Sequence, residues 1–391
     1  MTISSGMAPR VAVVGGGQLA RMLAEPANAL GVPLRLLAAD AHESAAQVIP
    51  DLVVGDHHDL EALRAVTTGC AVVTFDHEHV PTEHLQALEA AGIACRPGPA
   101  ALVHAQDKCV MREAMTRLGA PQPRWSVVAD RGEIEAFGLP CVLKVSRGGY
   151  DGRGVWVVRD LAETAEPLAF ADRTGVQLLA EELVGFRREL AALVARRPSG
   201  QTVAYPVVAT TQRDGICHEV VAPAPDLSPE RAAEAQELAL RIAEALGVTG
   251  LLAVELFEAE DGGLLVNELA MRPHNTGHWT QDGAVTSQFE NHLRAVLDLP
   301  LGSPEPRARW TVMVNLLGET GSADGRLYDG YPPVLEGDPR ARVHLYGKEL
   351  RPGRKVGHVN AYGDDLDDCL ARARRAAAGL QGSGGQPGSG R

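Results

Sequence analysis

The first quarter of the chain alternates short apolar runs with stretches of helical periodicity. Apolar runs cover residues 11–14, 34–39, 52–54 and 72–75, and helical patterns cover 18–23, 60–66 and the residues after Pro81. Such alternation is typical of a parallel sheet with helices on both faces. The pattern therefore predicts an α/β domain over residues 1–100.

The middle of the chain has strand-like runs in close order, with few helical stretches between them. A helix is expected over residues 106–119, ended by Gly119 and Pro121. Expected strands cover residues 142–145, 155–158, 176–180, 189–195 and 203–208. An amphipathic helix over 229–246 has Ser228 as N-cap and Gly247 as its stop. The pattern predicts an antiparallel α+β region.

The last part of the chain begins with a stretch that resembles a linker, Gly302-Ser303-Pro304-Glu305-Pro306. Strands are expected near 312–316 and 343–346, followed by a helix over 365–378. The final residues are rich in glycine and serine, which predicts a disordered tail. The expected units are residues 1–100, 101–300 with a flap subdomain at about 130–205, 301–380, and the tail 381–391.

Composition narrows the class of protein. The formal net charge of −13 over 391 residues argues against nucleic-acid binding. The six cysteines are scattered without a Cys-x-x-Cys pair, so neither a structural zinc site nor a disulfide framework is indicated. No run approaches the roughly 18 apolar residues that a membrane span needs. We expect a cytoplasmic enzyme with no membrane partner.

A lysine at the end of a strand precedes a glycine-rich loop. Lys144 ends the run Val142-Leu143-Lys144, and Gly148-Gly149-Tyr150-Asp151-Gly152-Arg153-Gly154 follows within a few residues. Glycines let backbone amides approach an anion, and the lysine adds a point charge suited to phosphate. The alternatives are an ordinary surface lysine and a turn closed by an ion pair of Asp151 with Arg153. We favour a flap over nucleotide phosphates.

Two glutamates mark a later hairpin. Glu255 and Glu268 end two apolar runs that the turn Asp261-Gly262-Gly263 joins, and Asn267 stands beside the second glutamate. Paired carboxylates are suitable ligands for Mg²⁺ that bridges nucleotide phosphates. The alternative is a hairpin with both side chains in solvent. Together with the lysine strand and the flap, the hairpin predicts ATP-dependent ligase chemistry.

Three further patterns have competing explanations. Gly15-x-Gly17-x-x-Ala20, with Asp40 after the next strand, fits a dinucleotide fingerprint, a phosphate turn or a plain tight turn, and we favour phosphate. His77-Glu78-His79 could hold zinc, but no closed ligand set accompanies it. The cations between Lys348 and Lys355 predict an anion site, with a basic surface turn as the alternative.

These motifs, in this order, resemble the ATP-grasp superfamily and, within it, the 5-(carboxyamino)imidazole ribonucleotide synthase family of purine biosynthesis. The resemblance covers Val11 to about Asn360. It is carried by Gly15–Met22, Gly149–Gly154, Asn267–Asn275, Gly277–Gln281 and Arg351–His358. The last three are specific to the family. The resemblance implies an N-terminal Rossmann-like domain, central ATP-grasp α+β subdomains, a small C-terminal domain and a homodimer.

The resemblance also implies a nucleotide site. ATP would lie between two α+β subdomains, with Mg²⁺, or possibly Mn²⁺, on Glu255 and Glu268. The residues implied for ATP are Lys108, Lys144, Gly149, Tyr150, Asp151, Gly152, Arg153, Gly154, Val155, Glu181, Glu182, Leu183, Val184, Glu189, Gln212, Asn267 and Glu268. Family members carry histidine where this chain has Gln212, which puts a nucleotide contact there in doubt.

The implied reaction joins bicarbonate to an amine. Bicarbonate attacks the γ-phosphorus of ATP, and the carboxyphosphate formed, or carbon dioxide from it, carboxylates 5-aminoimidazole ribonucleotide. Residues implied for that ribonucleotide are Gly17, Gln18, Leu19, Asp76, Arg272, Asn275, Lys348, Arg351, Arg354 and Lys355, with Asp76 standing where the family has glutamate. Residues implied at the reacting centre are Tyr150, Asp151, Arg153, His274, Lys348 and Arg354.

Other activities remain open at this point. The nearest are sibling ATP-grasp enzymes, such as formate-dependent glycinamide ribonucleotide transformylase or a biotin-dependent carboxylase component. A Rossmann-type NAD(P)-dependent dehydrogenase and a non-catalytic nucleotide sensor are more distant alternatives. Dependence on bicarbonate and on aminoimidazole ribonucleotide distinguishes carboxylation of the ribonucleotide from all of these activities.

Overall fold

The computed structural model describes residues 8–149, 154–213, 215–318 and 327–382. The chain begins with a parallel five-stranded sheet of order β3-β2-β1-β4-β5, as the alternation of apolar runs predicted. Its strands are β1 Val11–Val14, β2 Leu34–Ala38, β3 Leu52–Val54, β4 Val72–Phe75 and β5 Ala94–Cys95. The helices between them are α1 Gln18–Leu30, α2 Leu60–Thr67 and α3 Thr82–Ala90.

Two helices lead out of this sheet where one was expected. They are α4 Pro99–Gln106 and α5 Lys108–Leu118. Asp107 separates them because its backbone is extended and its side chain accepts hydrogen bonds from the amides of Cys109 and Val110. The expected helix over 106–119 is therefore correct for α5 but begins two residues later. Gly119 ends α5 with a left-handed backbone (φ 60°), as predicted.

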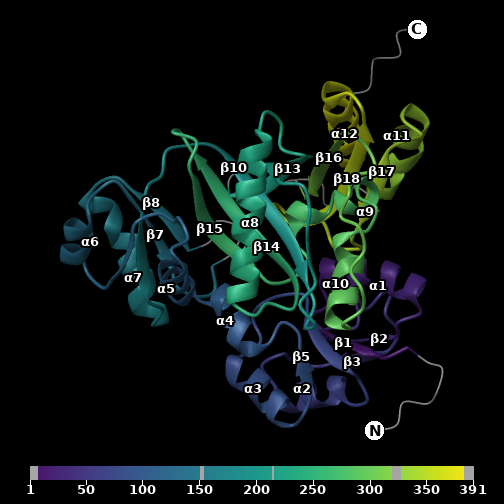
Figure 1. Ribbon diagram of the computed structural model, residues 1–391, viewed down its shortest axis with the longest axis horizontal. Helices are drawn as coiled ribbons and strands as arrows, with labels where there is room; N and C mark the ends of the chain where they lie inside the picture. The colour runs from purple at the N-terminus through teal and green to yellow at the C-terminus, as the bar shows by residue number, and fades with distance from the viewer. Residues whose placement is uncertain (1–7, 150–153, 214, 319–326, 383–391) are drawn as a thin grey trace.

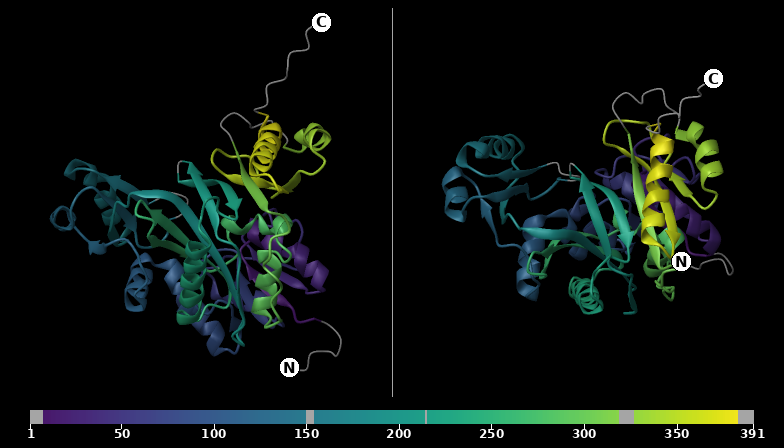
Figure 2. Two further views of the ribbon diagram at one scale, coloured as in Figure 1. Left: turned by 45° about the horizontal axis from the view of Figure 1, so that its top comes forward. Right: turned by 90° about the horizontal axis from the view of Figure 1, so that it is seen from above.

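A small antiparallel sheet of order β6-β9-β7-β8 follows, and it stands out as a lobe in Figures 1 and 2. Its strands are β6 Trp125–Val128, β7 Cys141–Val145, β8 Val155–Val158 and β9 Leu178–Glu182. Three short helices missed by the periodicity cover it: α6 Arg131–Phe137, η1 Leu161–Thr164 and α7 Ala165–Thr174. The lobe has its own core, in which Leu143 and Ile134 are fully buried.

The rest of the described strands form one antiparallel sheet of order β15-β14-β10-β12-β13-β16-β18-β17, with β11 paired to β10. Its strands are β10 Phe186–Arg196, β11 Thr202–Ala204, β12 Val208–Arg213, β13 Ile216–Ala222, β14 Gly250–Ala259, β15 Leu264–Ala270, β16 Trp310–Leu317, β17 Arg342–Leu345 and β18 Lys355–Gly363. The single strand expected over 203–208 is two strands, because Pro206 cannot donate to a ladder. The linker-like segment over 302–306 does not divide the strands into two sheets, because β16 after it pairs with β13 before it.

The remaining helices are α8 Pro229–Ala245, η2 Asn275–Gly277, α9 Thr280–Gly283, α10 Gln288–Val296, η3 Leu327–Gly330, α11 Tyr331–Gly337 and α12 Leu366–Gln381. Ser228 caps α8 through a bond from the amide of Arg231, as predicted. In the part of the chain that the structure describes, no helix is long and apolar enough to cross a membrane. The expected disordered tail lies outside the described residues from 383 onward.

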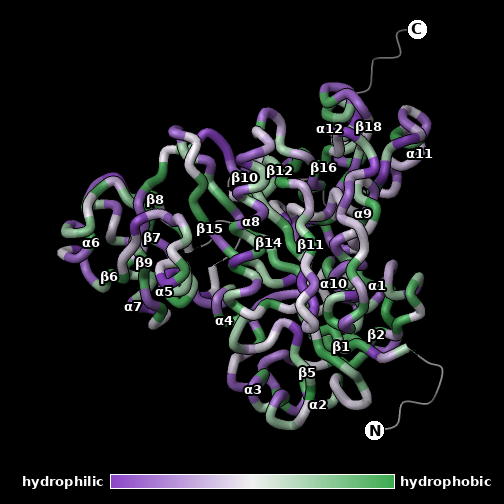
Figure 3. Tube along the Cα trace, in the orientation of Figure 1, coloured by the Kyte–Doolittle hydropathy of each residue, from purple (hydrophilic) through white to green (hydrophobic). Residues whose placement is uncertain are grey.

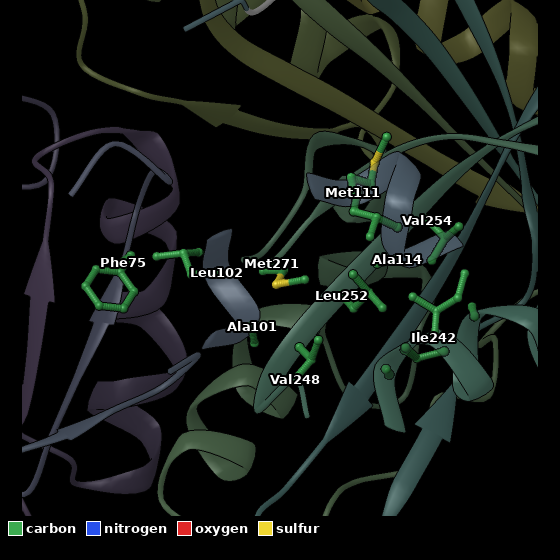
Figure 4. Close-up of a cluster of buried hydrophobic side chains, with 14 of the residues drawn as sticks. Phe75, Ala101, Leu102, Met111, Ala114, Ile242, Val248, Leu252, Val254 and Met271 are labelled. Atoms are coloured by element: carbon green, nitrogen blue, oxygen red, sulfur yellow. The ribbon is translucent and has the colours of Figure 1, made fainter. Parts of the chain in front are cut away.

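One hydrophobic core joins the N-terminal sheet to the central sheet. Figure 4 shows Phe75 of β4 and Leu102 of α4 on one side, with Met271 between them and Leu252 of β14. On the far side lie Met111 of α5 and Ile242 of α8 (Figure 4). The hydropathy trace in Figure 3 is green along β1 and along β14, the strands that lie in these cores. Since apolar burial is worth about 25 cal/mol per Å², this shared core fixes how the two sheets meet.

Candidate active site

The strand lysine predicted to meet phosphates lies inside an ion-pair network. Lys144, on β7, places Nζ 2.8 Å from Oε2 of Glu181 on the neighbouring strand β9. The same Nζ donates to Oδ1 of Asn267 on β15 at 3.1 Å. The side chain of Lys144 is 9% exposed. This lysine is therefore a buried ammonium between the two sheets and not an ordinary surface residue.

A second buried cation, Arg112 of α5, organises the same network. Its Nε donates to Oε1 of Glu181 at 2.7 Å, and its two Nη atoms donate to the backbone oxygens of Val266 and Asn267 at 2.7 and 2.9 Å. The Glu181 carboxylate is thus shared by two cations and is 2% exposed. Burial alone would raise the pKa of Glu181, but Lys144 and Arg112 outweigh it and lower that pKa. The carboxylate of Glu181 is consequently committed to these cations.

Glu255 and Glu268 are paired across the β14–β15 hairpin, as the sequence predicted. Lys108, the first residue of α5, places Nζ 2.9 Å from Oε1 of Glu268. The side chains of Glu255 and Glu268 are 27% and 41% exposed, so both carboxylates open to one side of the sheet. The hairpin therefore presents two carboxylate groups beside the ammonium groups of Lys108 and Lys144.

The two carboxyls differ in acidity. Burial, then the nearby charges of Glu268 and Glu189, raise the pKa of Glu255 to about 7. Burial also acts on Glu268, but Lys108 and Lys144 reverse its effect and lower that pKa to about 2. Crowding of negative charge at Glu255 is what a divalent cation would relieve. Together with the amide oxygen of Asn267, the donor set suits Mg²⁺, which prefers oxygen ligands.

The residues expected around adenine lie at the end of β9. Glu182, Leu183 and Val184 lead from β9 into β10. Glu182 and Val184 line a pocket of about 360 Å³, together with Gln122, Pro123, Gly185, Ala259, Glu260, Asp261 and Leu265. Further along β10, burial raises the pKa of Glu189, whose side chain is hydrogen-bonded to Gln212. A larger hollow of about 500 Å³, between α1 and β17, contains none of the site residues expected from the sequence.

The glycine turn after β1 is filled by the protein's own side chains. Asp76 accepts hydrogen bonds from the amides of Gly17 and Ala20 at 2.9 and 2.8 Å, at the start of α1. A Cβ atom on Gly17 would lie 2.0 Å from Oδ2 of Asp76, and one on Gly16 would lie 1.9 Å from Oε2 of Glu43. An internal carboxylate therefore occupies the helix N-terminus in this structure, where a phosphate or a dinucleotide would otherwise lie. The expectation of a phosphate in this turn stays a prediction.

Two of the residues expected to contact the ribonucleotide make contacts within the protein, and their expected ligand contacts stay predictions. Asp76 has both carboxylate oxygens on α1, as described above. The side chain of Leu19 is buried in the hydrophobic core of the N-terminal sheet. Gln18 accepts a hydrogen bond from Nζ of Lys348, which brings the start of α1 to the segment before β18. Among Gln18, Leu19 and Asp76, it is Gln18 that offers a side-chain amide beside a cation.

Residues after β15 connect the hairpin to the N-terminal sheet. Nε of Arg272 donates to Oε2 of Glu78, beyond the end of β4, at 2.7 Å. His274 places Nε2 3.5 Å from Oε1 of Glu255, and its Nδ1 lies 2.9 Å from Oγ1 of Thr276. Burial, followed by the charges of Arg272 and Lys355, lowers the pKa of His274 to about 3. His274 is therefore a neutral imidazole beside the acidic hairpin, and Asn275 follows it as a buried amide.

The four predicted cations separate into two groups. Arg351 is exposed and pairs at 2.6 Å with Glu349 on the surface. Lys348, by contrast, is part-buried, and burial followed by the charges of Arg354 and Lys355 lowers its pKa against the effect of Asp76. The charge of Lys355, the first residue of β18, acts on both Glu255 and His274. Lys348 lies beside Gln18, Lys355 acts on groups of the hairpin, and Arg354 is close enough to act on Lys348, whereas Arg351 fits the surface-turn alternative.

The flap falls partly outside the described residues. Tyr150, Asp151, Gly152 and Arg153 lie there, so their expected contacts stay predictions. Gly149 and Gly154 flank this gap, and Val155 follows as the first residue of β8. Gly154 has a left-handed backbone (φ 72°). A Cβ atom on Gly154 would lie 2.5 Å from a methyl of Val145 on β7, so the loop returns tightly against the lysine strand.

The sequence did not single out Arg112 or Glu78. Arg112 stands four residues after Lys108 on α5, so both cations occupy one helix face. Once Lys108 is expected at the phosphates, this four-residue spacing predicts that Arg112 lies on the same side of the helix. Glu78 was noted only beside two histidines, because its partner Arg272 lies 194 residues away.

Comparisons with protein families divide the chain in three. Residues 8–106 match a ribonucleotide synthetase preATP-grasp domain, residues 113–289 match an ATP-grasp domain, and residues 311–372 match a phosphoribosylaminoimidazole carboxylase C-terminal domain. The fold class expected from the motifs is thereby confirmed, with a parallel α/β unit ahead of the ATP-grasp region.

Individual proteins show the same likeness over most of their length. The chain is 54% identical over 383 residues to N5-carboxyaminoimidazole ribonucleotide synthase of Mycobacterium tuberculosis, covering 96% of this chain and 88% of that protein. A solved ADP complex of an N5-carboxyaminoimidazole ribonucleotide synthetase matches with a TM-score of 0.87 at 33% identity, covering 96% of this chain and 98% of that chain. The Aspergillus clavatus enzyme in complex with ADP and 5-aminoimidazole ribonucleotide matches with a TM-score of 0.86 at 32% identity, covering 95% and 98%.

Proposed function

Because this chain belongs to the N5-carboxyaminoimidazole ribonucleotide synthase family, we propose that it uses ATP to carboxylate 5-aminoimidazole ribonucleotide on its exocyclic amine. The enzyme is an ATP-dependent ligase of purine biosynthesis. The observation that carries the assignment to this chain is the opposed pair Glu255 and Glu268 beside the ammonium of Lys108. A cytoplasmic location and a homodimer remain part of the proposal.

The nucleotide is proposed to lie between the four-stranded sheet and the β14–β15 hairpin. Its adenine would occupy the pocket lined by Glu182 and Val184, with the ribose toward Glu189 and Gln212. Its phosphates would meet Lys144 and Lys108, which now neutralise Glu181 and Glu268. These ammoniums are held in place before ATP arrives, so little reorganisation is required when charge develops on the transferred phosphoryl group.

Glu255, Glu268 and the Asn267 amide would hold Mg²⁺, with Mn²⁺ as a possible substitute. A divalent ion there screens the phosphate oxygens and lowers the barrier to phosphoryl transfer. In the transfer itself, an oxygen of bicarbonate forms a bond to the γ-phosphorus while the bond to ADP breaks. The carboxyphosphate formed passes its carboxyl group to the amine, which loses a proton as phosphate leaves.

The ribonucleotide is proposed to approach from the N-terminal sheet. Lys348, which bonds Gln18, and Arg354 are the cations best placed for its phosphate. The charge of Lys355 acts on Glu255, and His274 lies 3.5 Å from Glu255, so the amine is proposed to reach the carboxyl donor beside these two residues. The low pKa of His274 makes it a weak base, and its proposed role is to orient the amine through a hydrogen bond.

The test is product formation by the purified chain. ADP release is followed with and without 5-aminoimidazole ribonucleotide and bicarbonate, and ¹³C-bicarbonate is used to detect the new N-carboxylate by nuclear magnetic resonance. We expect ADP release and ¹³C incorporation only when both substrates are present. ADP release that needs formate and glycinamide ribonucleotide instead would assign the transformylase activity and overturn the proposal.

A further inference from the structure

Four histidines from two loops gather at the carboxyl edge of the N-terminal sheet. His57 and His58 follow β3, while His77 and His79 follow β4. Ring centroids are 4.1 Å apart for His57 and His58, 4.5 Å for His57 and His77, and 5.2 Å for His77 and His79. The function proposed above uses none of these imidazoles.

A carboxylate joins the cluster. Oδ1 of Asp56 lies 2.9 Å from Nδ1 of His58 and 3.6 Å from Nδ1 of His57. One ligand atom from each of these three residues lies within 4.8 Å of the others. Tetrahedral bonds of about 2.0–2.1 Å would bring such atoms to roughly 3.4 Å apart. Asp56 and His58 are exposed, so their side chains have room to rotate toward that spacing.

One ring nitrogen of the cluster has no partner among the described residues. Within the described residues, Nε2 of His57 is buried without a hydrogen-bond partner. Burial lowers the pKa of His57, and it lowers the pKa of His77 to about 3. The unpartnered Nε2 of His57 is available to an ion, whereas Nδ1 of His77 already accepts from the amide of His79 at 3.1 Å. A neutral imidazole is the form that binds metal.

We propose that Asp56, His57 and His58 form a site for a divalent first-row transition ion such as Zn²⁺, Co²⁺ or Ni²⁺. The ring of His77, tilted at 60° to that of His57 with the two centroids 4.5 Å apart, is proposed as the fourth ligand. Two imidazoles and one carboxylate favour such ions over Mg²⁺, which the carboxylate hairpin would take. This site is separate from Glu255 and Glu268, and it draws only on residues of the N-terminal sheet.

The experiment measures metal binding without any catalytic readout. The full-length chain without a histidine tag is titrated with Co²⁺, followed by its visible absorption, and with Zn²⁺ by calorimetry, both in excess Mg²⁺. We expect one ion to bind with a tetrahedral-type Co²⁺ spectrum that Mg²⁺ does not displace. Zn²⁺ should displace Co²⁺, because zinc binds nitrogen ligands more tightly.

Variants assign the site. His57→Gln/His58→Gln should weaken Zn²⁺ binding more than about 100-fold, because loss of groups that merely orient ligands already costs about 10–100-fold. Asp56→Asn, at an exposed position, tests the same site if the double variant fails to fold. His42→Gln removes an exposed imidazole of the same sheet and should leave binding unchanged. Absence of Co²⁺ binding in the parent chain, or binding in the His57→Gln/His58→Gln and Asp56→Asn variants equal to that of the parent, would show that the cluster is only ring packing.

Discussion

Glu255 and Glu268 lie directly opposite each other across β14 and β15, yet their carboxyls have pKa values of about 7 and about 2. The difference arises because the ammonium of Lys108 contacts Glu268 at 2.9 Å, while Glu255 has the neutral ring of His274 as its neighbour. One carboxyl of the pair is therefore anionic at neutral pH, and the other gains its full charge only when a cation binds beside it.

We predict that Glu268→Gln abolishes ADP formation while the chain stays folded. The amide keeps the shape of the side chain but removes the charge that holds Mg²⁺ and pairs with Lys108, at a cost of several kcal/mol in barrier. Glu255→Gln should be less severe, because it removes one metal ligand but leaves the pair of Lys108 with Glu268 intact. Steady-state ADP release measures both, with Glu237→Gln on the exposed face of α8 as the control. Turnover near the parent value in Glu268→Gln would contradict the metal assignment.

Arg112→Met should destabilise the chain by about 3–5 kcal/mol. The change leaves the buried carboxylate of Glu181 with Lys144 alone and strips the partner from two buried carbonyl oxygens. Urea unfolding followed by circular dichroism gives the loss. Arg117→Met, on the same helix but 65% exposed, should change stability by less than about 0.5 kcal/mol. Equal losses of stability in the two variants would show that the buried contacts of Arg112 do not stabilise the chain more than an exposed arginine does.

Arg354→Ala should raise the Michaelis constant for aminoimidazole ribonucleotide about ten- to a hundred-fold, with little change in ATP affinity. One charged hydrogen bond to a phosphate is worth about 1.5–3 kcal/mol. Arg351→Ala is the matched control, because Arg351 is exposed and already paired with Glu349. Kinetics in the ribonucleotide and calorimetric titration with ATP separate the two substrates. A variant that loses ATP affinity and keeps its ribonucleotide constant would move Arg354 to the other half of the site.

Stability should fall steeply as the pH drops below about 6.5. Burial lowers the pKa of His292 to about 3 from an ordinary 6.5, so between these values the unfolded chain binds a proton that the folded chain does not. The free energy of unfolding then falls by about 1.4 kcal/mol per pH unit for each such histidine. His278 and His358 are buried with pKa values lowered in the same sense.

His292→Gln tests this titration directly. The ring of His292 accepts from the amide of Leu251 at 3.2 Å and lies 2.7 Å from Oγ1 of Thr74, so it joins the two large sheets as a neutral group. Removing it should make the slope of unfolding free energy against pH shallower by about 1.4 kcal/mol per unit between pH 4 and 6. Denaturant unfolding at several pH values measures that slope. An unchanged slope would mean that His292 does not titrate on unfolding.

Local patterns predicted most of the elements, and the failures have local causes too. The strand β18 was not among the expected strands, because Lys355 closes a run of cations that predicted an anion site, although the residues after it are buried on both faces. The helices α6 and α7 are short and lie on a small lobe, so they bury few apolar residues and show little periodicity. Pro206 was visible as a break but was not used.

The residue types of the site could be predicted from the sequence, but their contact partners could be predicted only in part. The pairing of Glu255 with Glu268 follows from a hairpin whose turn is visible in the sequence. By contrast, Asp76 reaches α1 from 56 residues away, and nothing local distinguishes an internal carboxylate from a bound phosphate at a helix N-terminus. The buried Arg112 could be inferred only through its helical spacing from Lys108.

The junction of β13 with β16 has a consequence for dissecting the chain. Residues Glu219–Ala222 of β13 pair with the strand that opens the C-terminal region, and most of β13 is buried. A fragment cut within 302–306 would expose that strand as an unprotected hydrophobic edge, a template for intermolecular pairing. Expression of residues 1–305 alone should therefore yield aggregates, and the catalytic region has to be studied with its C-terminal strands attached.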